Sequence, residues 1–207
     1  MKRKIDKKII KEILEIAKQM DEKGMVNTYE GNISVKKDNL IYITPSSKSK
    51  AKLTKNMIAV VDENGDQIYG DFKPSSEFPM HSNTYLMRDD INAIIHCHSP
   101  FLTAYAICNK KVETKCYPEM IMLLIDIPVA PYGKPGTNEI YSGVEPLIKN
   151  RNVILLANHG VLCVGPNLAT VFNRLESAEA IAKVLTIAEK VGKPVELPEK
   201  ELARLKK

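Results

Sequence analysis

Two histidines separated by a single residue form the pattern with the clearest chemical potential in this sequence. His96 and His98 follow a mostly apolar stretch, residues 91–95, that is typical of a short buried strand. Side chains alternate between the two faces of a strand, so both imidazoles should point to one side and Cys97 to the other. Two imidazoles about 6–7 Å apart along a strand can bind one metal ion, although strand histidines are also common as ordinary polar groups. The pair alone therefore leaves a metal site and a structural role open.

A third histidine lies in the tripeptide Asn158-His159-Gly160. Asn and Gly are typical of tight turns because both tolerate unusual backbone angles, and a turn would account for these two residues but not for the histidine between them. Together with His96 and His98, His159 would complete a set of three imidazoles. Three side-chain ligands are the usual protein contribution to a catalytic metal centre that keeps coordination positions open.

The segment Ser75-Ser76-Glu77 combines two hydroxyls with the predicted start of a helix. Free backbone N–H groups at a helix start, together with hydroxyls, can bind an anion. A serine that merely caps the helix ahead of an acidic residue is the competing interpretation. The turns at residues 31–32 and 44–47 are further candidate phosphate sites, and none of these segments matches a P-loop or a dinucleotide-binding fingerprint.

The elements that must position these residues follow from apolar periodicity and from turn residues. Helices are predicted over residues 5–23, 77–88, 101–108, 140–149 and 168–191, and strands over residues 32–35, 40–44, 57–61, 67–69, 91–95, 127–130, 153–157 and 161–164. Gly24 and Gly192 should end the first and last helices, and Ser99-Pro100 should begin a helix directly after the histidine pair. Strands joined by hairpins favour a mainly antiparallel sheet whose faces are covered by helices.

Composition sets the broad class of the protein. The length of 207 residues predicts one domain, residues 1–207, and the apolar and charged fractions of 44% and 27% are those of an ordinary globular protein. No apolar run approaches a membrane span, and the first residues lack the pattern of a signal peptide. The net charge of +5 is modest and no basic stripe with aromatic residues occurs, so neither nucleic acid nor a membrane is expected as a partner. The four cysteines lack CxxC spacing and are expected to be reduced thiols in a cytoplasmic protein.

Taken in chain order, the motifs GNIS, ITPSS, KPSSE, HCHSP, APYGKPGT and NHG, together with Tyr117, resemble the class II aldolase and epimerase family, most closely its L-fuculose-phosphate aldolase type. The likeness extends from the first helix to at least the long helix near the C-terminus. It implies an α/β fold of the class II aldolase type, with three α/β/α layers around a central, mostly antiparallel sheet. It also implies a homotetramer whose active sites lie between subunits.

The resemblance further implies roles for individual residues. The metal ligands would be His96, His98 and His159, which would hold a divalent ion, most often zinc and sometimes manganese or cobalt. Glu77 matches the acid–base carboxylate, which can also bind the resting metal, and Tyr117 matches a tyrosine that reaches into the site of a neighbouring subunit. The positions that match phosphate-binding residues are Gly31, Asn32, Ser46, Ser47, Ser75 and Ser76. Ser47 departs from the family pattern, because the best-known aldolases have glycine there.

The implied reaction is the cleavage of a ketose 1-phosphate, similar to L-fuculose 1-phosphate, into dihydroxyacetone phosphate and an aldehyde. Two related activities are alternatives. Methylthioribulose-1-phosphate dehydratases place a catalytic glutamate near the position of Glu119, and ribulose-phosphate 4-epimerases have aspartate where this chain has Glu77, so Glu77 favours an aldolase. A non-catalytic scaffold such as the adducin head is a more distant alternative, because those relatives lack the three histidines found here.

Overall fold

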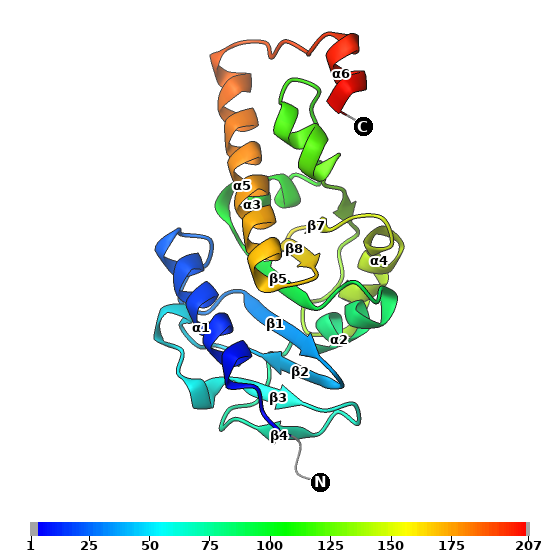
Figure 1. The fold of residues 1–207 in the computed structure, drawn as a ribbon. Coiled ribbons are helices and arrows are strands. Elements are labelled where there is room, and N and C mark those ends of the chain that lie inside the picture. Colours follow the sequence, from blue (N-terminus) through cyan, green and yellow to red (C-terminus); the bar gives the residue numbers. More distant parts are fainter. Residues whose placement is uncertain (1–3, 206–207) are drawn as a thin grey trace.

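The computed structural model describes residues 4–205, which form an eight-stranded sheet with the strand order β4-β3-β2-β1-β5-β8-β7-β6 (Figure 1). The strands are β1 (Asn32–Lys37), β2 (Leu40–Ile43), β3 (Ala59–Val61), β4 (Gln67–Tyr69), β5 (Ala93–Cys97), β6 (Val129–Ala130), β7 (Val153–Leu156) and β8 (Gly160–Gly165). Every neighbouring pair is antiparallel except β6 and β7, which run parallel. The expected mostly antiparallel sheet is confirmed, and the histidine strand β5 lies inside it between β1 and β8.

The predicted helices are all present. The α-helices are α1 (Lys7–Glu22), α2 (Phe78–Met87), α3 (Pro100–Ile107), α4 (Asn138–Ile148), α5 (Leu168–Val191) and α6 (Glu199–Leu205), and the short helices are η1 (Lys50–Lys52), η2 (Lys55–Met57) and the π-helix η3 (Met120–Leu124). Gly24, with a φ of 65°, follows the end of α1, and α5 ends at Gly192, as predicted. No helix within residues 4–205 is long and apolar enough to span a membrane.

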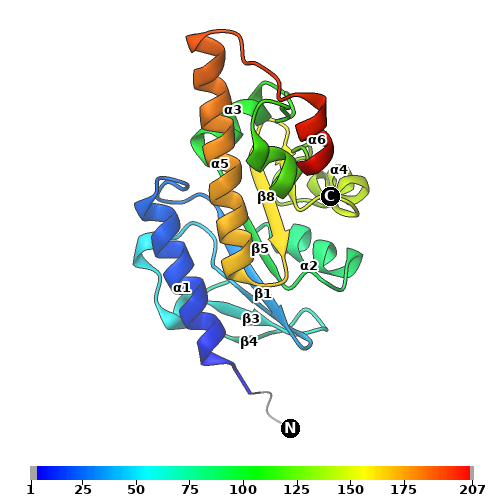
Figure 2. The same cartoon turned by 45° about the horizontal axis from the view of Figure 1, so that its top comes forward.

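Two packed cores lie on opposite faces of the sheet, so the chain forms three layers. Ile95 and Val161 belong to a core shared with α1, α3 and α5, whereas their neighbours Ile94 and Leu162 belong to a core shared with α2 and α4. This division follows from the alternation of side chains along β5 and β8. Figure 2 shows the long helix α5 and helix α1 running side by side across one face. The predicted α/β/α architecture is confirmed.

Two predicted strands are each two residues shorter than expected. The strand expected over residues 57–61 begins only at Ala59, because Lys55–Met57 closes a 3₁₀ turn. The strand expected over residues 127–130 is reduced to β6, and Ile127 instead forms an isolated bridge with Val112. Local apolar runs indicate burial, but the pairing partner decides how much of a run joins the sheet.

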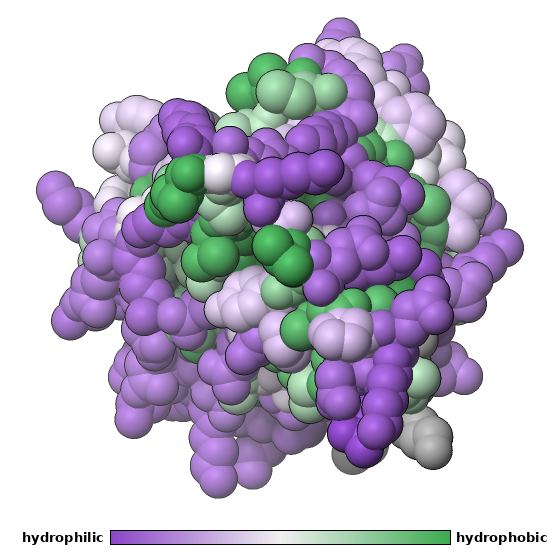
Figure 3. All heavy atoms as spheres, turned by 90° about the horizontal axis from the view of Figure 1, so that it is seen from above, coloured by the Kyte–Doolittle hydropathy of each residue, from purple (hydrophilic) through white to green (hydrophobic). Residues whose placement is uncertain are grey.

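The helices η3 and α6 were not predicted. The η3 segment is a continuous apolar run, which periodicity cannot distinguish from a strand, and α6 has only seven residues, too few to show a clear apolar period. Met122, Leu123 and Ile125 around η3 are 61%, 56% and 67% exposed. Apolar side chains gather in several groups on the face that Figure 3 shows from above.

Candidate active site

The metal-ligand candidate His96 is held in the centre of the sheet. It lies opposite Asn32 on β1 and opposite Leu162 on β8, and its side chain is fully buried. Strand β5 ends at Cys97, so His98 follows directly at the point where the chain leaves the sheet. The histidine pair is therefore presented at the end of a buried strand.

The segment that follows the pair is anchored by a carboxylate from another helix. Ser99 is the N-cap of α3 and Pro100 its first residue, as predicted. The Ser99 hydroxyl does not cap its own helix but donates to Glu179 on α5 at 2.8 Å, and the same carboxylate accepts the Phe101 N–H at 2.8 Å and the Leu102 N–H at 2.9 Å. A carboxylate at a helix N-terminus is favourable because it complements unpaired N–H groups and the helix dipole. Glu179 thereby fixes where β5 ends and α3 begins.

The third histidine reaches the pair through the turn between β7 and β8. Asn158 adopts a left-handed φ of 57°, which confirms the predicted turn. Gly160 is required by close approach, since a Cβ there would lie 2.5 Å from the Cys97 carbonyl oxygen and 2.6 Å from His98 Cδ2. The absence of a side chain at Gly160 lets this turn lie directly against the end of β5 and brings His159 to the site.

The three imidazoles surround one point. Their ring centroids are 4.7–5.0 Å apart, and one ligand atom from each ring lies within 4.8 Å of the others. Glu77 joins them from the start of α2, with Oε2 3.3 Å from His96 Nε2 and Oε1 3.6 Å from His159 Nε2. Glu77 is itself the N-cap of α2 but makes no side-chain capping bond, so its carboxylate is free to face the histidines. The structure thus brings together all four predicted metal-binding residues.

Hydrogen bonds determine which ring nitrogens could serve as ligands. His96 Nδ1 lies 3.0 Å from the Val161 carbonyl oxygen, and because a carbonyl only accepts, Nδ1 carries the proton and Nε2 keeps its lone pair. His98 Nε2 is 3.2 Å from this atom, while His98 Nδ1 faces Glu30 at 3.4 Å. Two nitrogens bound at about 2.1 Å to one tetrahedral zinc ion would be about 3.4 Å apart, so the observed spacing fits a shared cation.

The protonation of the site also suits a metal. Burial lowers the pKa of His96 to about 3, with a further contribution from His98. Burial, followed by the neighbouring His96, lowers the pKa of His159 to about 4. Both rings are therefore neutral near pH 7, the state in which imidazole binds metals. Glu77 Oε1 and His159 Nδ1 are buried and have no hydrogen-bond partner among the described residues. Three imidazoles and a carboxylate form a donor set that fits zinc, manganese or cobalt.

A hollow of about 460 Å³ opens beside the histidines and is lined by most of the predicted site residues. The predicted residues that line it are Gly31, Asn32, Ser46, Ser47, Ser75, Ser76, Glu77, His98 and His159. Within residues 4–205, no lysine or arginine lines it, so these residues would bind an anionic group there through hydroxyls and backbone N–H groups. Tyr29, Glu30, Pro135 and Gly136 also line the hollow and were not predicted, although they directly flank or belong to the GNIS and APYGKPGT motifs.

The two serine-containing turns are joined by a hydrogen bond. Ser46 Oγ accepts the Ser76 backbone N–H at 2.7 Å, and this contact closes one wall of the hollow. Ser47 has a φ of 52°, in the left-handed region where glycine is favoured. Ser47 therefore adopts a backbone conformation that favours glycine, and its hydroxyl lies at the edge of the hollow.

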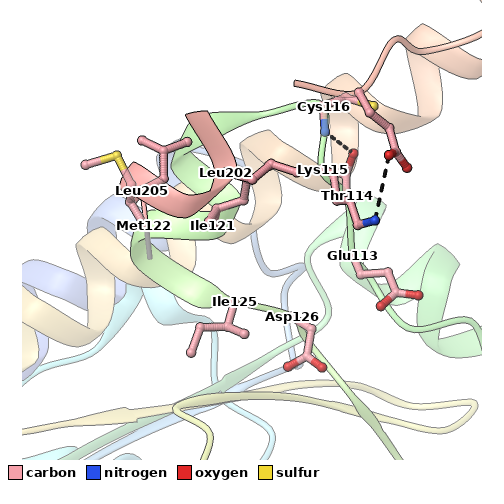
Figure 4. Close-up of a pocket in the computed structure, with 11 residues that line it drawn as sticks. Glu113, Thr114, Lys115, Cys116, Ile121, Met122, Ile125, Asp126, Leu202 and Leu205 are labelled. Atoms are coloured by element: carbon pink, nitrogen blue, oxygen red, sulfur yellow. Dashed lines mark hydrogen bonds and ion pairs between the residues drawn. The ribbon is translucent and has the colours of Figure 1, made fainter. Parts of the chain in front are cut away.

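Tyr117 and Glu119 do not join the histidines of their own chain. Tyr117 is partly buried against the α1, α3 and α5 core, Glu119 is exposed at the start of η3, and neither lines the histidine hollow. A separate hollow of about 1020 Å³ lies between the 113–126 segment and α6, with Cys116 and Leu202 among its lining residues (Figure 4). It contains none of the predicted site residues.

Residues 11–186 match the family described as the Class II Aldolase and Adducin N-terminal domain. The chain belongs to this family. The resemblance inferred from the ordered motifs is thus confirmed, and the match includes every predicted site residue.

Two relatives and one solved structure show how far this class II aldolase chain resembles known proteins. The L-fuculose phosphate aldolase of Methanococcus maripaludis is 34% identical over 173 residues, which cover 84% of this chain and 93% of the relative. The 5-deoxy-D-ribulose 1-phosphate aldolase of Bacillus thuringiensis is 30% identical, over 95% of this chain and 92% of the relative. A solved L-fuculose 1-phosphate aldolase superposes with a TM-score of 0.89 at 33% identity, covering 98% of this chain and 96% of that structure. The expected class II aldolase fold is confirmed.

Proposed function

We propose that this chain is a metal-dependent class II aldolase that cleaves a ketose 1-phosphate of the L-fuculose 1-phosphate type into dihydroxyacetone phosphate and an aldehyde. The observation that carries the proposal is the meeting of His96, His98, His159 and Glu77 at the wall of a hydroxyl-lined hollow. The proposal includes zinc as the resident metal, residues 1–207 as one catalytic domain, a homotetramer and a cytoplasmic location. The four unpaired cysteines agree with a reducing compartment.

In the proposed mechanism, the cation would stabilise charge and the side chains would transfer protons. His96, His98 and His159 would hold a divalent ion, which when bound would supply Lewis-acid stabilisation of negative charge on the substrate. Asn32 Nδ2 donates to Glu77 Oε2 at 2.7 Å, which orients the carboxylate, whereas Oε1 keeps free lone pairs. Glu77 Oε1 is thus the oxygen that would hold a proton and give it to the carbon that has lost its bond to the aldehyde, and the proton released from the substrate hydroxyl as the aldehyde forms balances this transfer.

The remaining residues would bind and orient the substrate. The serine hydroxyls and backbone N–H groups around the Ser46–Ser76 contact would bind the phosphate, which is remote from the bond that breaks and so contributes orientation. Tyr117 would exchange a proton with the aldehyde oxygen in the site of a neighbouring subunit. Its position outside the hollow of its own chain supports this assignment.

The identity of the aldehyde half has a second candidate. The Bacillus thuringiensis relative is named as an aldolase for 5-deoxy-D-ribulose 1-phosphate, and it aligns with nearly the whole chain. Both candidate substrates share the ketose 1-phosphate end that the serine turns and the metal site would recognise. They differ only in the part released as aldehyde.

The test is an assay of dihydroxyacetone phosphate release. The purified protein, loaded in turn with zinc, manganese and cobalt, is offered L-fuculose 1-phosphate, 5-deoxyribulose 1-phosphate and other ketose 1-phosphates. We expect a chelator to abolish the cleavage. Borohydride should trap no enzyme–substrate adduct, because the proposed mechanism uses no lysine Schiff base. Absence of cleavage with every sugar and metal, in a protein that retains its metal, would rule out the aldolase proposal.

A further inference from the structure

The fourth histidine, His81, is fully buried on α2 and does not belong to the metal cluster. Its Nε2 lies 2.5 Å from Asn32 Oδ1, and its Nδ1 lies 2.7 Å from Ser34 Oγ. Ser34 Oγ is in turn 2.7 Å from the Tyr85 hydroxyl. Asn32 Nδ2 completes the series with its hydrogen bond to Glu77 Oε2. A continuous chain of buried polar groups therefore runs from Tyr85 to the proposed acid–base carboxylate.

The donors and acceptors of this chain can be arranged in only one order. An ionised carboxylate only accepts, so Asn32 must present its amide NH₂ to Glu77 and its carbonyl oxygen to His81. His81 Nε2 must then carry a proton. Burial lowers the pKa of His81 to about 3, so the ring is neutral and its Nδ1 must accept the Ser34 hydroxyl proton. Ser34 Oγ is left to accept from Tyr85.

The order of donors and acceptors fixes the orientation of the Asn32 amide beside Glu77. If the Asn32 amide rotated by half a turn while His81 kept its Nε2–H tautomer, the amide carbonyl oxygen would face the carboxylate, and the NH₂ would face an N–H of His81. Both contacts would be repulsive, and an unsatisfied buried polar group is costly. His81 therefore locks the amide, and the amide holds Oε2 while Oε1 stays without a partner.

We propose that His81 is a positioning residue, which holds the Asn32 amide so that Glu77 keeps Oε2 bound and Oε1 free for proton transfer. This role rests on the proposed function of Glu77. It gives the His81–Ser34–Tyr85 group on α2 and β1 a task in the reaction that does not involve contact with substrate or metal.

The tautomer of His81 tests the hydrogen-bond order without any substrate. Long-range ¹H–¹⁵N NMR of ¹⁵N-histidine-labelled protein distinguishes an imidazole protonated at Nε2 from one protonated at Nδ1, and the His81→Gln spectrum identifies the signal. We expect the neutral Nε2–H form in both the metal-free and the zinc-loaded protein. A neutral Nδ1–H form or a doubly protonated ring at pH 7 would overturn the proposal. Because no turnover is needed, this result is separate from success or failure of the aldolase assay.

Kinetics test the positioning role itself. His81→Ala should lower kcat by about 10–100-fold, the range typical of residues that orient a catalytic group, with KM and bound metal largely unchanged. His81→Gln offers an amide N–H to Asn32 and a carbonyl oxygen to Ser34, so its kcat should be close to that of the parent protein. It also provides a folded variant to measure if His81→Ala does not fold. The matched control is Thr84→Val, which removes a buried hydroxyl on the same helix that bonds only the Met80 carbonyl, and which should leave kcat nearly unchanged.

A double variant separates positioning from general destabilisation. In a Glu77→Gln background the carboxylate is gone, so His81→Ala should cause no further loss of the residual kcat, although it should still lower thermal stability. An equal loss of kcat in both backgrounds would show that His81 acts through the fold rather than through Glu77. Wild-type kcat in a folded His81→Ala variant would also reject the proposal.

Discussion

At the scale of single residues, the site is a cluster of lone pairs that a cation would satisfy. The Nε2 atoms of His96 and His98 face each other at 3.2 Å, and Glu77 Oε1 and His159 Nδ1 have no hydrogen-bond partner among the described residues. When both facing nitrogens keep their lone pairs, they repel one another unless a positive charge lies between them. Binding of a divalent ion would remove this cost and so add to its affinity.

Replacing one ligand should remove the metal without unfolding the chain. His96→Ala leaves two imidazoles, so we expect most of the bound divalent ion to be lost, measured as metal content per chain by mass spectrometry, with an unchanged circular dichroism spectrum. The matched control is His81→Gln, which removes a buried histidine outside the cluster and should keep its metal. Full metal occupancy in His96→Ala would contradict the assignment.

Two carboxylates can be compared directly for the acid–base role. Glu77→Gln keeps the size and the Asn32 contact but removes the basic oxygen, so turnover should fall by about 10²–10⁴-fold while most of the metal remains. Glu119→Gln alters an exposed residue away from the hollow and should stay active. The reverse pattern, an active Glu77→Gln and an inactive Glu119→Gln, would favour the dehydratase alternative.

At the scale of elements, three chain segments must meet within a few ångströms. Strand β5 delivers two histidines, the β7–β8 turn delivers the third, and Glu179 on α5 fixes the start of α3 just beyond the pair. At Gly160 the turn lies so near the Cys97 carbonyl that a Cβ would be 2.5 Å from its oxygen. The packing of this turn therefore controls the geometry of the metal site.

Gly160→Ala should weaken metal binding although no ligand is changed. The new methyl group would lie 2.5 Å from the Cys97 carbonyl oxygen, and because backbone cannot yield as a flexible side chain does, the turn must move away from His96 and His98. We expect metal affinity, measured by competition with a chelator, to fall by about 10–100-fold, as for other changes next to a ligand set. Gly192→Ala, which has nothing within 4 Å and an extended φ of 173°, should bind metal like the parent protein.

At the scale of the whole molecule, the buried histidines make stability depend on pH. Burial lowers the pKa of His81 and His96 to about 3 and that of His159 to about 4, all below the value of about 6.5 for an exposed imidazole. The unfolded chain therefore binds more protons as the pH falls below about 6.5, so the free energy of unfolding should decrease from there towards pH 4. The contribution is complete above about pH 6.5, where both states are neutral.

Denaturant unfolding of the metal-free protein between pH 5 and pH 8 measures this dependence. For the fully buried His81 and His96, each proton taken up on unfolding contributes a slope of about 1.4 kcal/mol per pH unit. The His81→Gln variant should lose one such contribution. A stability that does not change between pH 7 and pH 5 would show that these rings are protonated in the folded protein.

Assembly should decide activity, because Tyr117 lies outside the hollow of its own chain. If each site is shared, Tyr117→Phe chains and Glu77→Gln chains can complement each other in a mixed oligomer. We expect the separate variants to be nearly inactive and the mixture to regain activity after subunit exchange, measured as dihydroxyacetone phosphate release. Tyr117→Phe removes only a hydroxyl, so its metal content and fold should match the parent.

Two results would contradict a shared site. Mixed oligomers without recovered activity, after exchange has been verified by mass spectrometry, would place Tyr117 in its own chain or outside the reaction. A fully active monomer at high dilution would exclude the shared site directly. Unmixed Glu77→Gln oligomers carried through the same exchange procedure serve as the control.

Local patterns in the sequence predicted the helices, most strands and the residue types of the candidate site. Apolar periodicity located the helices and most strands, and the spacing of His96 and His98 predicted two imidazoles that the structure brings to one point. Both are local properties, because the direction of a side chain within a helix or strand depends on its position in that element. The ordered motifs added the family, since their combination is more specific than any one of them.

Contacts between residues far apart in the sequence became visible only in the folded structure. Asn32 and Glu77 are 45 residues apart, and their hydrogen bond exists because β1 pairs with β5 and α2 packs behind them. His81 carried no sequence signal, since a lone histidine on a helix is indistinguishable from an ordinary buried polar residue, and Gly160 was predicted as a turn residue rather than as a point of backbone contact. Such contacts depend on strand order and packing between elements, which the periodicity of a single segment does not contain.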